Sequence, residues 1–196
     1  PWSCKTEPVM PRLGPVRPLT RPPERPLVFL DIEASSLAPD SWPVEIGCAW
    51  IGPAGVEVSE ALIRPRPDWP LSSWSARAGE VHGISLAQLE AAGYPAENVA
   101  RATDALRDVD LVSNNPHWDA YWLARLRGPE RPALRVRLLR SVAAERLDAA
   151  AADRLALALL RRTAPHRAGA DALQLATAWA EALAPRPRQA ASNAAA

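Results

Sequence analysis

The chain has 196 residues, 48% hydrophobic and 23% charged, which is the composition of a globular domain with a sizeable core. No uncharged apolar run reaches the roughly 18 residues that a membrane-spanning helix needs, and two cysteines are too few for a disulfide scaffold. A net charge of +1 argues at first against a nucleic-acid partner, because such proteins usually carry a basic surface.

The distribution of charge removes that objection. Residues 1–26 carry five basic and two acidic side chains, residues 27–184 carry 16 arginines and 20 acids, and residues 185–196 carry two arginines. The chain is therefore an acidic body of charge −4 between two basic ends of charge +3 and +2. The position of the acids within the body decides what the protein can bind.

The two ends of the sequence differ from the body in composition. Residues 1–26 hold 8 of the 21 prolines and show no hydrophobic periodicity, and proline disfavours both helix and strand. We expect a disordered leader over 1–26, one folded domain over 27–184, and a disordered tail over 185–196.

Short apolar and alternating runs predict five strands, of which the first three are joined by short turns and form an antiparallel meander. Helical spacing of leucine, a serine cap at residue 85 and a proline at residue 95 predict the helices. The predicted strands are 27–32, 44–51, 56–64, 111–113 and 134–139. The predicted helices are a turn at 71–76 and longer segments at 85–92, 95–107, 117–126, 143–161 and 169–183. This order indicates an α/β fold with a mixed five-stranded sheet flanked by helices.

Asp31 and Glu33 lie at the end of the first predicted strand, which otherwise is apolar. Alternate residues of a strand point to the same side, so both carboxylates face one way. Burying two like charges is costly unless a cation compensates them. The pair therefore either faces solvent or holds a metal ion, and the pair alone does not decide between the two.

Three further residues could belong to the same chemistry. Asp119 follows a strand and a turn and stands in the first turn of a predicted helix, where the helix dipole favours an acid in any case. His166 and Asp171 precede and open the last predicted helix, where a loop histidine and a helix-entry acid are common. Each feature has an ordinary structural explanation, and only their combination is distinctive.

In combination, these motifs resemble the DnaQ-like 3′–5′ exonucleases, the DEDDh branch of the ribonuclease H-like superfamily. The motifs are residues 31–37 (DIEASSL), 115–119 (NPHWD) and 166–171 (HRAGAD), with a further family-like element at 81–84 (VHGI). The resemblance covers 27–184 and implies a ribonuclease H-like sheet. The sequence departs from the family pattern at two positions, with Ser36 in place of the usual glycine and Asn114 in place of a frequent histidine. These departures affect expected nucleotide contacts and leave the acids and His166 intact.

The resemblance implies a metal-dependent 3′–5′ exonuclease that hydrolyses phosphodiester bonds at the 3′ end of single-stranded DNA or RNA and releases nucleoside 5′-monophosphates. It implies that Asp31, Glu33, Asp119 and Asp171 hold two Mg²⁺ or Mn²⁺ ions, which prefer oxygen ligands. It also implies that His166 is the general base for the attacking water, because imidazole titrates near neutral pH.

Four residues are expected by resemblance to contact the substrate: Leu37, His82, Asn115 and Ala34. Structural alternatives stay open for three of them, since Leu37 could be a core residue, His82 a turn residue bonded to backbone, and Asn115 a turn former. Trp118 and Trp122 lie four residues apart on one helix and are predicted to be core residues more than base-stacking ones.

Two other functions stay open from the sequence. One is a catalytically silent nucleic-acid-binding or regulatory module on the same fold, and the other is a proofreading-type subunit of a larger replication or repair assembly. For the leading function we expect single-stranded 3′ ends as partners, no membrane contact and a cytoplasmic location, with a homodimer as a possible assembly.

Overall fold

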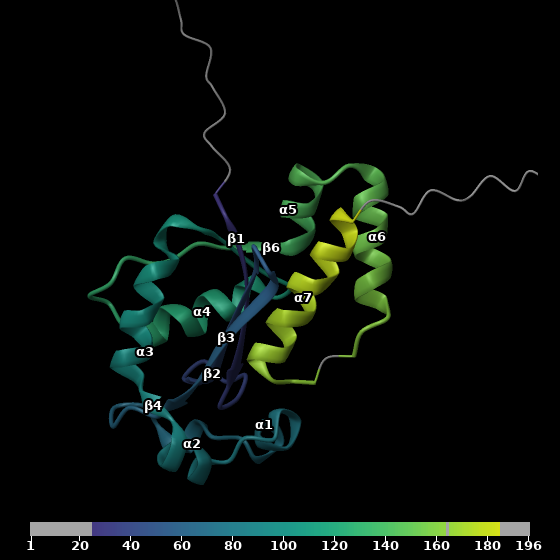
Figure 1. Cartoon of the computed structure of the whole chain (residues 1–196). Helices are drawn as coiled ribbons and strands as arrows, with labels where there is room; N and C mark the ends of the chain where they lie inside the picture. The colour runs from purple at the N-terminus through teal and green to yellow at the C-terminus, as the bar shows by residue number, and fades with distance from the viewer. Residues whose placement is uncertain (1–24, 164, 185–196) are drawn as a thin grey trace, which may run out of the picture.

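The computed structural model describes residues 25–163 and 165–184. The disordered leader and tail expected from the sequence therefore lie outside the described residues, apart from positions 25 and 26. The described residues form a mixed sheet with helices on both faces (Figure 1).

The sheet has six strands in the order β4-β3-β2-β1-β5-β6. β1 pairs antiparallel with β2 and parallel with β5, and β2 pairs antiparallel with β3, which confirms the predicted meander and the mixed α/β class. The prediction of five strands missed β4, a two-residue strand that pairs with the end of β3. The strands are β1 (Leu27–Ala34), β2 (Pro43–Gly52), β3 (Gly55–Arg64), β4 (Tyr94–Pro95), β5 (Asp110–Ser113) and β6 (Val136–Leu138).

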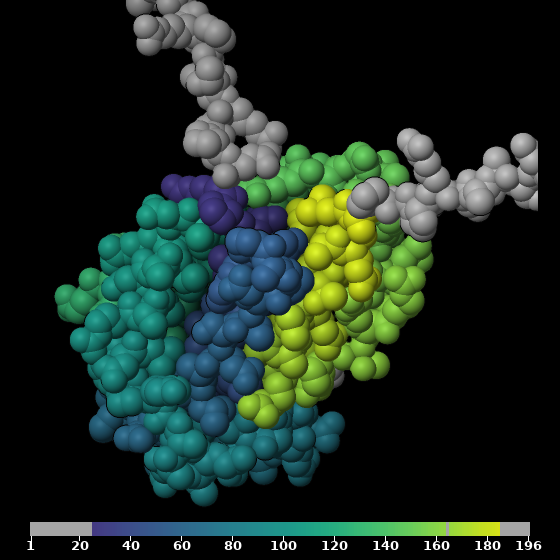
Figure 2. Space-filling view, in the orientation of Figure 1, coloured from purple at the N-terminus to yellow at the C-terminus, as the bar shows by residue number. Residues whose placement is uncertain are grey.

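Helices cover both faces of this sheet, with α3 and α4 on one side and α5, α6 and α7 on the other, while α1 and α2 lie at one end (Figure 1). In the space-filling view β3 runs between the teal helices and α7 (Figure 2). Helix α7 packs against β3. The helices are α1 (Ala76–His82), α2 (Leu86–Ala92), α3 (Ala96–Ala102), α4 (Pro116–Arg127), α5 (Leu139–Arg146), α6 (Ala149–Leu160) and α7 (Ala168–Leu183), with 3₁₀ turns at Leu71–Ser73 and Thr103–Asp108.

One helical prediction was wrong in detail, and one helix was not predicted. The single helix expected over 143–161 is α5 followed by α6, because Asp148 accepts a hydrogen bond from the Ala151 N–H at 2.7 Å and caps a new helix. Helix α1 was not predicted, although Ser75 caps its first turn and Gly83 ends it with φ 68°, a left-handed conformation that glycine adopts readily.

The central strand β1 divides the apolar core into two parts. Val28, Leu30 and Ile32 pack on the side of α3 and α4, whereas Phe29 packs on the side of α7 against Trp179. By the alternation of a strand, Asp31 and Glu33 share the face of Phe29 and lie toward α7. The strand that is richest in core residues thus carries two acids to its carboxyl end. No described helix is long and apolar enough to cross a membrane.

Candidate active site

A cleft of about 830 Å³ opens where β1 ends, between α1, α4, α6 and α7. Every residue predicted to act in catalysis or substrate binding lines this cleft, although the residues come from distant segments of the chain. Those lining residues are Asp31, Glu33, Ala34, Leu37, His82, Asn115, Asp119, His166 and Asp171.

Glu33, His166 and Asp171 form the tightest group in the cleft. One potential ligand atom of each lies within 4.8 Å of the others, which is a spacing that one metal ion could bridge. Glu33 comes from the carboxyl end of β1, Asp171 from the first turn of α7, and His166 from the loop that leads into α7. The approach of α7 to β1 therefore brings together groups that are 138 positions apart in the sequence.

Asp119 reaches the cleft from the first turn of α4 and is 3% exposed. Its Oδ1 accepts a hydrogen bond from the Ile32 N–H at 3.1 Å, and its Oδ2 accepts one from the Ser113 hydroxyl. Ser113 in turn accepts a bond from the Asn115 N–H at 2.8 Å. These contacts fix the carboxylate against the backbone of β1, between the two acids of that strand.

The pKa of each acid in the cleft is raised, chiefly because burial disfavours ionisation and, for Asp31 and Glu33, also because neighbouring acids repel the charge. Burial, followed by repulsion from Asp119, Glu33 and Asp171, raises the pKa of Asp31 to about 8. Burial and repulsion from Asp171 raise the pKa of Glu33 to about 7. Burial raises the pKa of Asp119 to about 7, although its hydrogen bonds oppose the shift.

The cationic side chains at the cleft do not neutralise this cluster. Arg162 is bonded to Glu181 at 2.7 Å, and Arg77 lies 3.7 Å from Glu80. Four carboxylates, each with a pKa raised chiefly by burial, fit the oxygen-donor set that a hard divalent cation takes. The donor set therefore fits Mg²⁺ or Mn²⁺.

Burial distinguishes the surroundings of two of the predicted substrate contacts. Leu37 is 70% exposed at the cleft, so it is not a core residue. His82 is buried, and its Nδ1 accepts a hydrogen bond from the Ile84 N–H at 3.1 Å, which matches the turn alternative while the ring still lines the cleft. Burial also lowers the pKa of His82, which favours the neutral ring.

The two tryptophans of α4 both pack in or against the core and both line the cleft. Trp122 is 6% exposed and belongs to the core, as predicted, whereas Trp118 is half-buried. Their rings stack with centroids 5.2 Å apart, and both line the cleft. Asn115 is exposed and precedes α4 without a side-chain capping bond, and Ala34 is a buried wall residue.

Sequence reasoning missed three polar residues that support this site. Ser113 holds Asp119, and its place after two apolar residues of a short strand gave no signal of that contact. Glu45 and Arg167 form a bidentate pair behind Glu33, with Nη2–Oε1 at 2.6 Å and Nε–Oε2 at 3.0 Å. A lone acid between Val44 and Ile46 in an apolar strand was the available signal for Glu45.

The architecture is similar to that of proteins of known structure. No protein-family profile and no curated protein matches the chain. Among solved structures, the zinc-bound complex of E. coli exonuclease I with single-stranded DNA superposes with a TM-score of 0.55 at 16% identity, over 80% of this chain and 40% of that one. The chain shares the fold of part of exonuclease I.

A second exonuclease I structure, in complex with a dT13 oligonucleotide, matches at a TM-score of 0.45 and 17% identity, over 53% of this chain and 23% of that one. This chain thus spans less than half the length of the exonuclease I chains that it matches. The structural match at a TM-score of 0.55 and the mixed sheet flanked by helices agree with the architecture expected from the sequence.

Proposed function

We propose that this protein is a metal-dependent 3′–5′ exonuclease of the DEDDh type, which removes nucleoside 5′-monophosphates from the 3′ end of single-stranded DNA or RNA. The observation that carries the proposal is the convergence of four acids and one histidine in a single cleft. These residues come from β1, α4, α7 and the loop before α7, so no local structural role explains why they meet.

The proposed metal ligands are Asp31, Glu33, Asp119 and Asp171. Two Mg²⁺ or Mn²⁺ ions held there would supply a polarised water and stabilise the charge on the leaving oxygen. Support for a divalent ion comes from burial, which raises the pKa of Asp31, Glu33 and Asp119, and from repulsion by neighbouring acids, which adds to the shift at Asp31 and Glu33. The zinc-bound form of E. coli exonuclease I supports metal binding on this fold.

The chain's own groups would divide the remaining work. His166 is exposed at the cleft, with a ring nitrogen within 4.8 Å of oxygens of Glu33 and Asp171, and would take the proton of the attacking water. Leu37 and Trp118 offer apolar and aromatic surface on which a terminal base could lie without sequence preference. DNA is the first substrate to test, because the exonuclease I structures contain single-stranded DNA.

The test is digestion of matched single-stranded DNA, single-stranded RNA and dinucleotides with Mg²⁺, with Mn²⁺ and with EDTA, followed by chromatography of the products. We expect metal-dependent release of 5′-monophosphates by the wild type and its loss in Asp31→Ala and His166→Ala. Undiminished activity in Asp31→Ala would rule the proposal out. A folded wild type that binds Mn²⁺ but cleaves none of the substrates would favour the silent module.

A further inference from the structure

Glu45 is a carboxylate that the proposed chemistry does not use. It lies on β2 directly opposite Glu33 of β1, and it is 1% exposed. Its two oxygens accept three hydrogen bonds, from the Arg167 Nε and Nη2 and from the Ala168 N–H at 2.9 Å. A buried acid with this many donors from one short segment holds that segment in place.

The segment held by Glu45 is the beginning of α7. Ala168 is the first residue of α7, and the first N–H groups of a helix have no partner within the helix. Arg167 precedes the helix and makes no capping bond with its own side chain, so Glu45 caps α7 from another element. Gly47, two residues further along β2, allows the approach, because a Cβ there would stand 2.1 Å from the carbonyl of Ala168.

The residues on either side of this contact are two of the proposed catalytic groups. His166 has φ 54°, a left-handed backbone that a residue with a side chain adopts only when its surroundings hold it. On the other side, the Asp171 N–H donates to the carbonyl of Arg167 at 2.9 Å. Movement of residues 167 and 168 would therefore move both His166 and Asp171 relative to Glu33.

We propose that Glu45 is a positioning residue, which through Arg167 and the N-terminus of α7 holds His166 and Asp171 in register with Glu33. This role rests on the proposed function for its kinetic consequence, but its effect on metal binding can be measured without any nuclease activity. Glu45 touches neither substrate nor water in this role and acts only through the segment that it holds.

A pair of charge-removing variants separates positioning from simple electrostatics. Glu45→Gln removes a negative charge near the metal ligands, and through charge alone it would weaken Mn²⁺ binding. Arg167→Ala removes a positive charge beside the same ligands, and through charge alone it would tighten Mn²⁺ binding. Loss of positioning predicts weaker binding in both variants.

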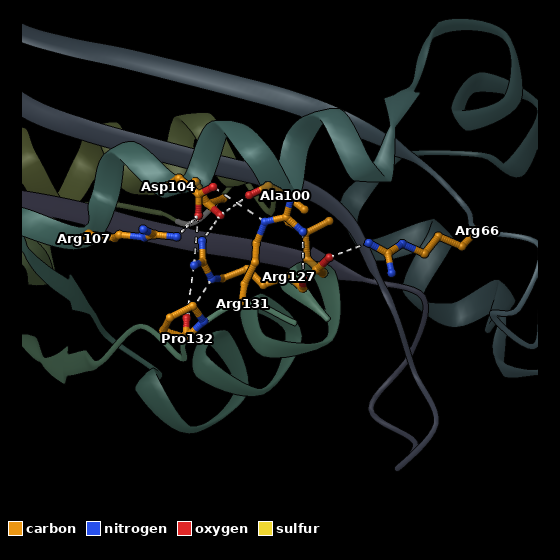
Figure 3. A network of polar contacts seen from close by, with 9 residues as sticks. Arg66, Ala100, Asp104, Arg107, Arg127, Arg131 and Pro132 are labelled. Carbon is orange, nitrogen blue, oxygen red and sulfur yellow. Dashed lines mark hydrogen bonds and ion pairs between the residues drawn. The ribbon is translucent and has the colours of Figure 1, made fainter. Parts of the chain in front are cut away.

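The chain offers a matched control in a second ion pair, between Arg127 and Asp104, neither of which lines the cleft (Figure 3). Arg127 is 1% exposed and lies 3.1 Å from Asp104, within a network that also includes Arg107 and Arg131. Asp104→Asn leaves a buried guanidinium without its carboxylate and so reports the general cost of breaking such a pair.

The measurements are Mn²⁺ affinity by titration, kcat and KM on a single-stranded oligonucleotide, and thermal unfolding. We expect Mn²⁺ affinity and kcat to fall roughly 10- to 100-fold in both Glu45→Gln and Arg167→Ala, with little change in KM. Asp104→Asn should lower the unfolding temperature and leave Mn²⁺ affinity and kcat at wild-type values.

Tighter Mn²⁺ binding in Arg167→Ala, or wild-type affinity in Glu45→Gln, would overturn the positioning role. If Glu45→Gln does not fold, Arg167→Ala decides alone, since the Arg167 side chain is 43% exposed and its removal leaves Glu45 bonded to Ala168. A wild type without nuclease activity would refute the proposed function, while the Mn²⁺ titrations would still decide whether Glu45 positions the ligands.

Discussion

Asp31 is the acid on which the other groups of the cleft converge. It stands on the central strand, and Asp119, Glu33, Asp171 and Glu45 all raise its pKa by repulsion in addition to burial. In such surroundings the ionised side chain destabilises the metal-free folded state, and it is well placed to bind a divalent cation. Its replacement should therefore separate stability from function.

Asp31→Asn should abolish metal-dependent nuclease activity while making the metal-free protein more stable at pH 8. The amide keeps the shape of the side chain and removes the charge that the neighbouring acids repel. Thermal unfolding in EDTA measures the stability, and at pH 5, where a carboxyl with a pKa of about 8 is protonated, the variant and wild type should unfold at similar temperatures. Lower stability than wild type at pH 8 would contradict this explanation.

Leu37 provides a test of substrate contact that does not disturb folding. Because its side chain is 70% exposed, Leu37→Ala should change the free energy of unfolding by less than about 0.5 kcal/mol. The loss of apolar surface at the cleft should raise KM for a single-stranded oligonucleotide several-fold. Leu157→Ala, at a leucine that is 56% exposed and outside the cleft, is the control and should leave KM unchanged.

At the scale of elements, the sequence predicts the strands and helices that place the acids. The apolar run at 27–32 and the alternation at 56–64 lead to β1 and β3, and the long helix at 169–183 is α7 within one residue. The missed two-residue strand β4 has no sequence signal, because it forms only by contact with the end of β3. The break between α5 and α6 was signalled by Asp148, and leucine periodicity on both sides masked it.

The sequence indicates the candidate residues of the site, but it does not indicate the side chains that hold those residues in place. Acids and a histidine at characteristic spacings are visible in the sequence, whereas the bonds of Ser113 to Asp119 and of Glu45 to Arg167 join segments that meet only in three dimensions. The latter pair spans 122 positions, a separation over which residue spacing carries no information.

The contact between β2 and α7 can be tested at Gly47. Gly47→Ala would place a methyl group 2.1 Å from the backbone of Ala168, so the beginning of α7 must shift. We expect a loss of about 1–3 kcal/mol in the free energy of unfolding and a marked fall in kcat. Gly52→Ala on the same strand is the control, because its Cβ would meet only the movable end of the Glu57 side chain. Equal effects of the two substitutions would contradict the role of this contact.

At the scale of the whole molecule, net charge takes on a different meaning. Residues 27–184 carry a net charge of −4, which two divalent cations would neutralise before any phosphate arrives. Bound ions are the largest local charges of such a site, so the low net charge of the chain does not argue against a nucleic-acid substrate. This distribution of charge favours modest affinity for the end of a single strand over tight binding of a long duplex.

The same acids predict how stability depends on pH. Asp31, Glu33 and Asp119 have a pKa of about 8, 7 and 7 in the folded metal-free protein, against values near 4 in an unfolded chain. The folded state therefore binds more protons between about pH 4 and pH 8, and its stability falls as the pH rises through that range.

We accordingly expect the unfolding temperature in EDTA to be lower at pH 8 than at pH 5, by roughly 3 °C for each kcal/mol lost. Added Mn²⁺ or Mg²⁺ should raise that temperature strongly at pH 8 and weakly at pH 5, where protons compete for the carboxylates. Differential scanning calorimetry at the two pH values measures both effects. Equal stabilisation by metal at pH 5 and pH 8 would contradict the assignment of these acids as ligands.

The proposed activity of this cleft is the hydrolysis of a nucleic acid from its 3′ end. The most direct measurement is a time course on single-stranded DNA labelled at the 5′ end, with a free 3′-hydroxyl or a blocked 3′ end, in Mn²⁺ and in EDTA. We expect a ladder that shortens one nucleotide at a time only with the free end and only with metal, together with release of 5′-monophosphates. Cleavage that ignores the blocked end, or that continues in EDTA, would contradict it.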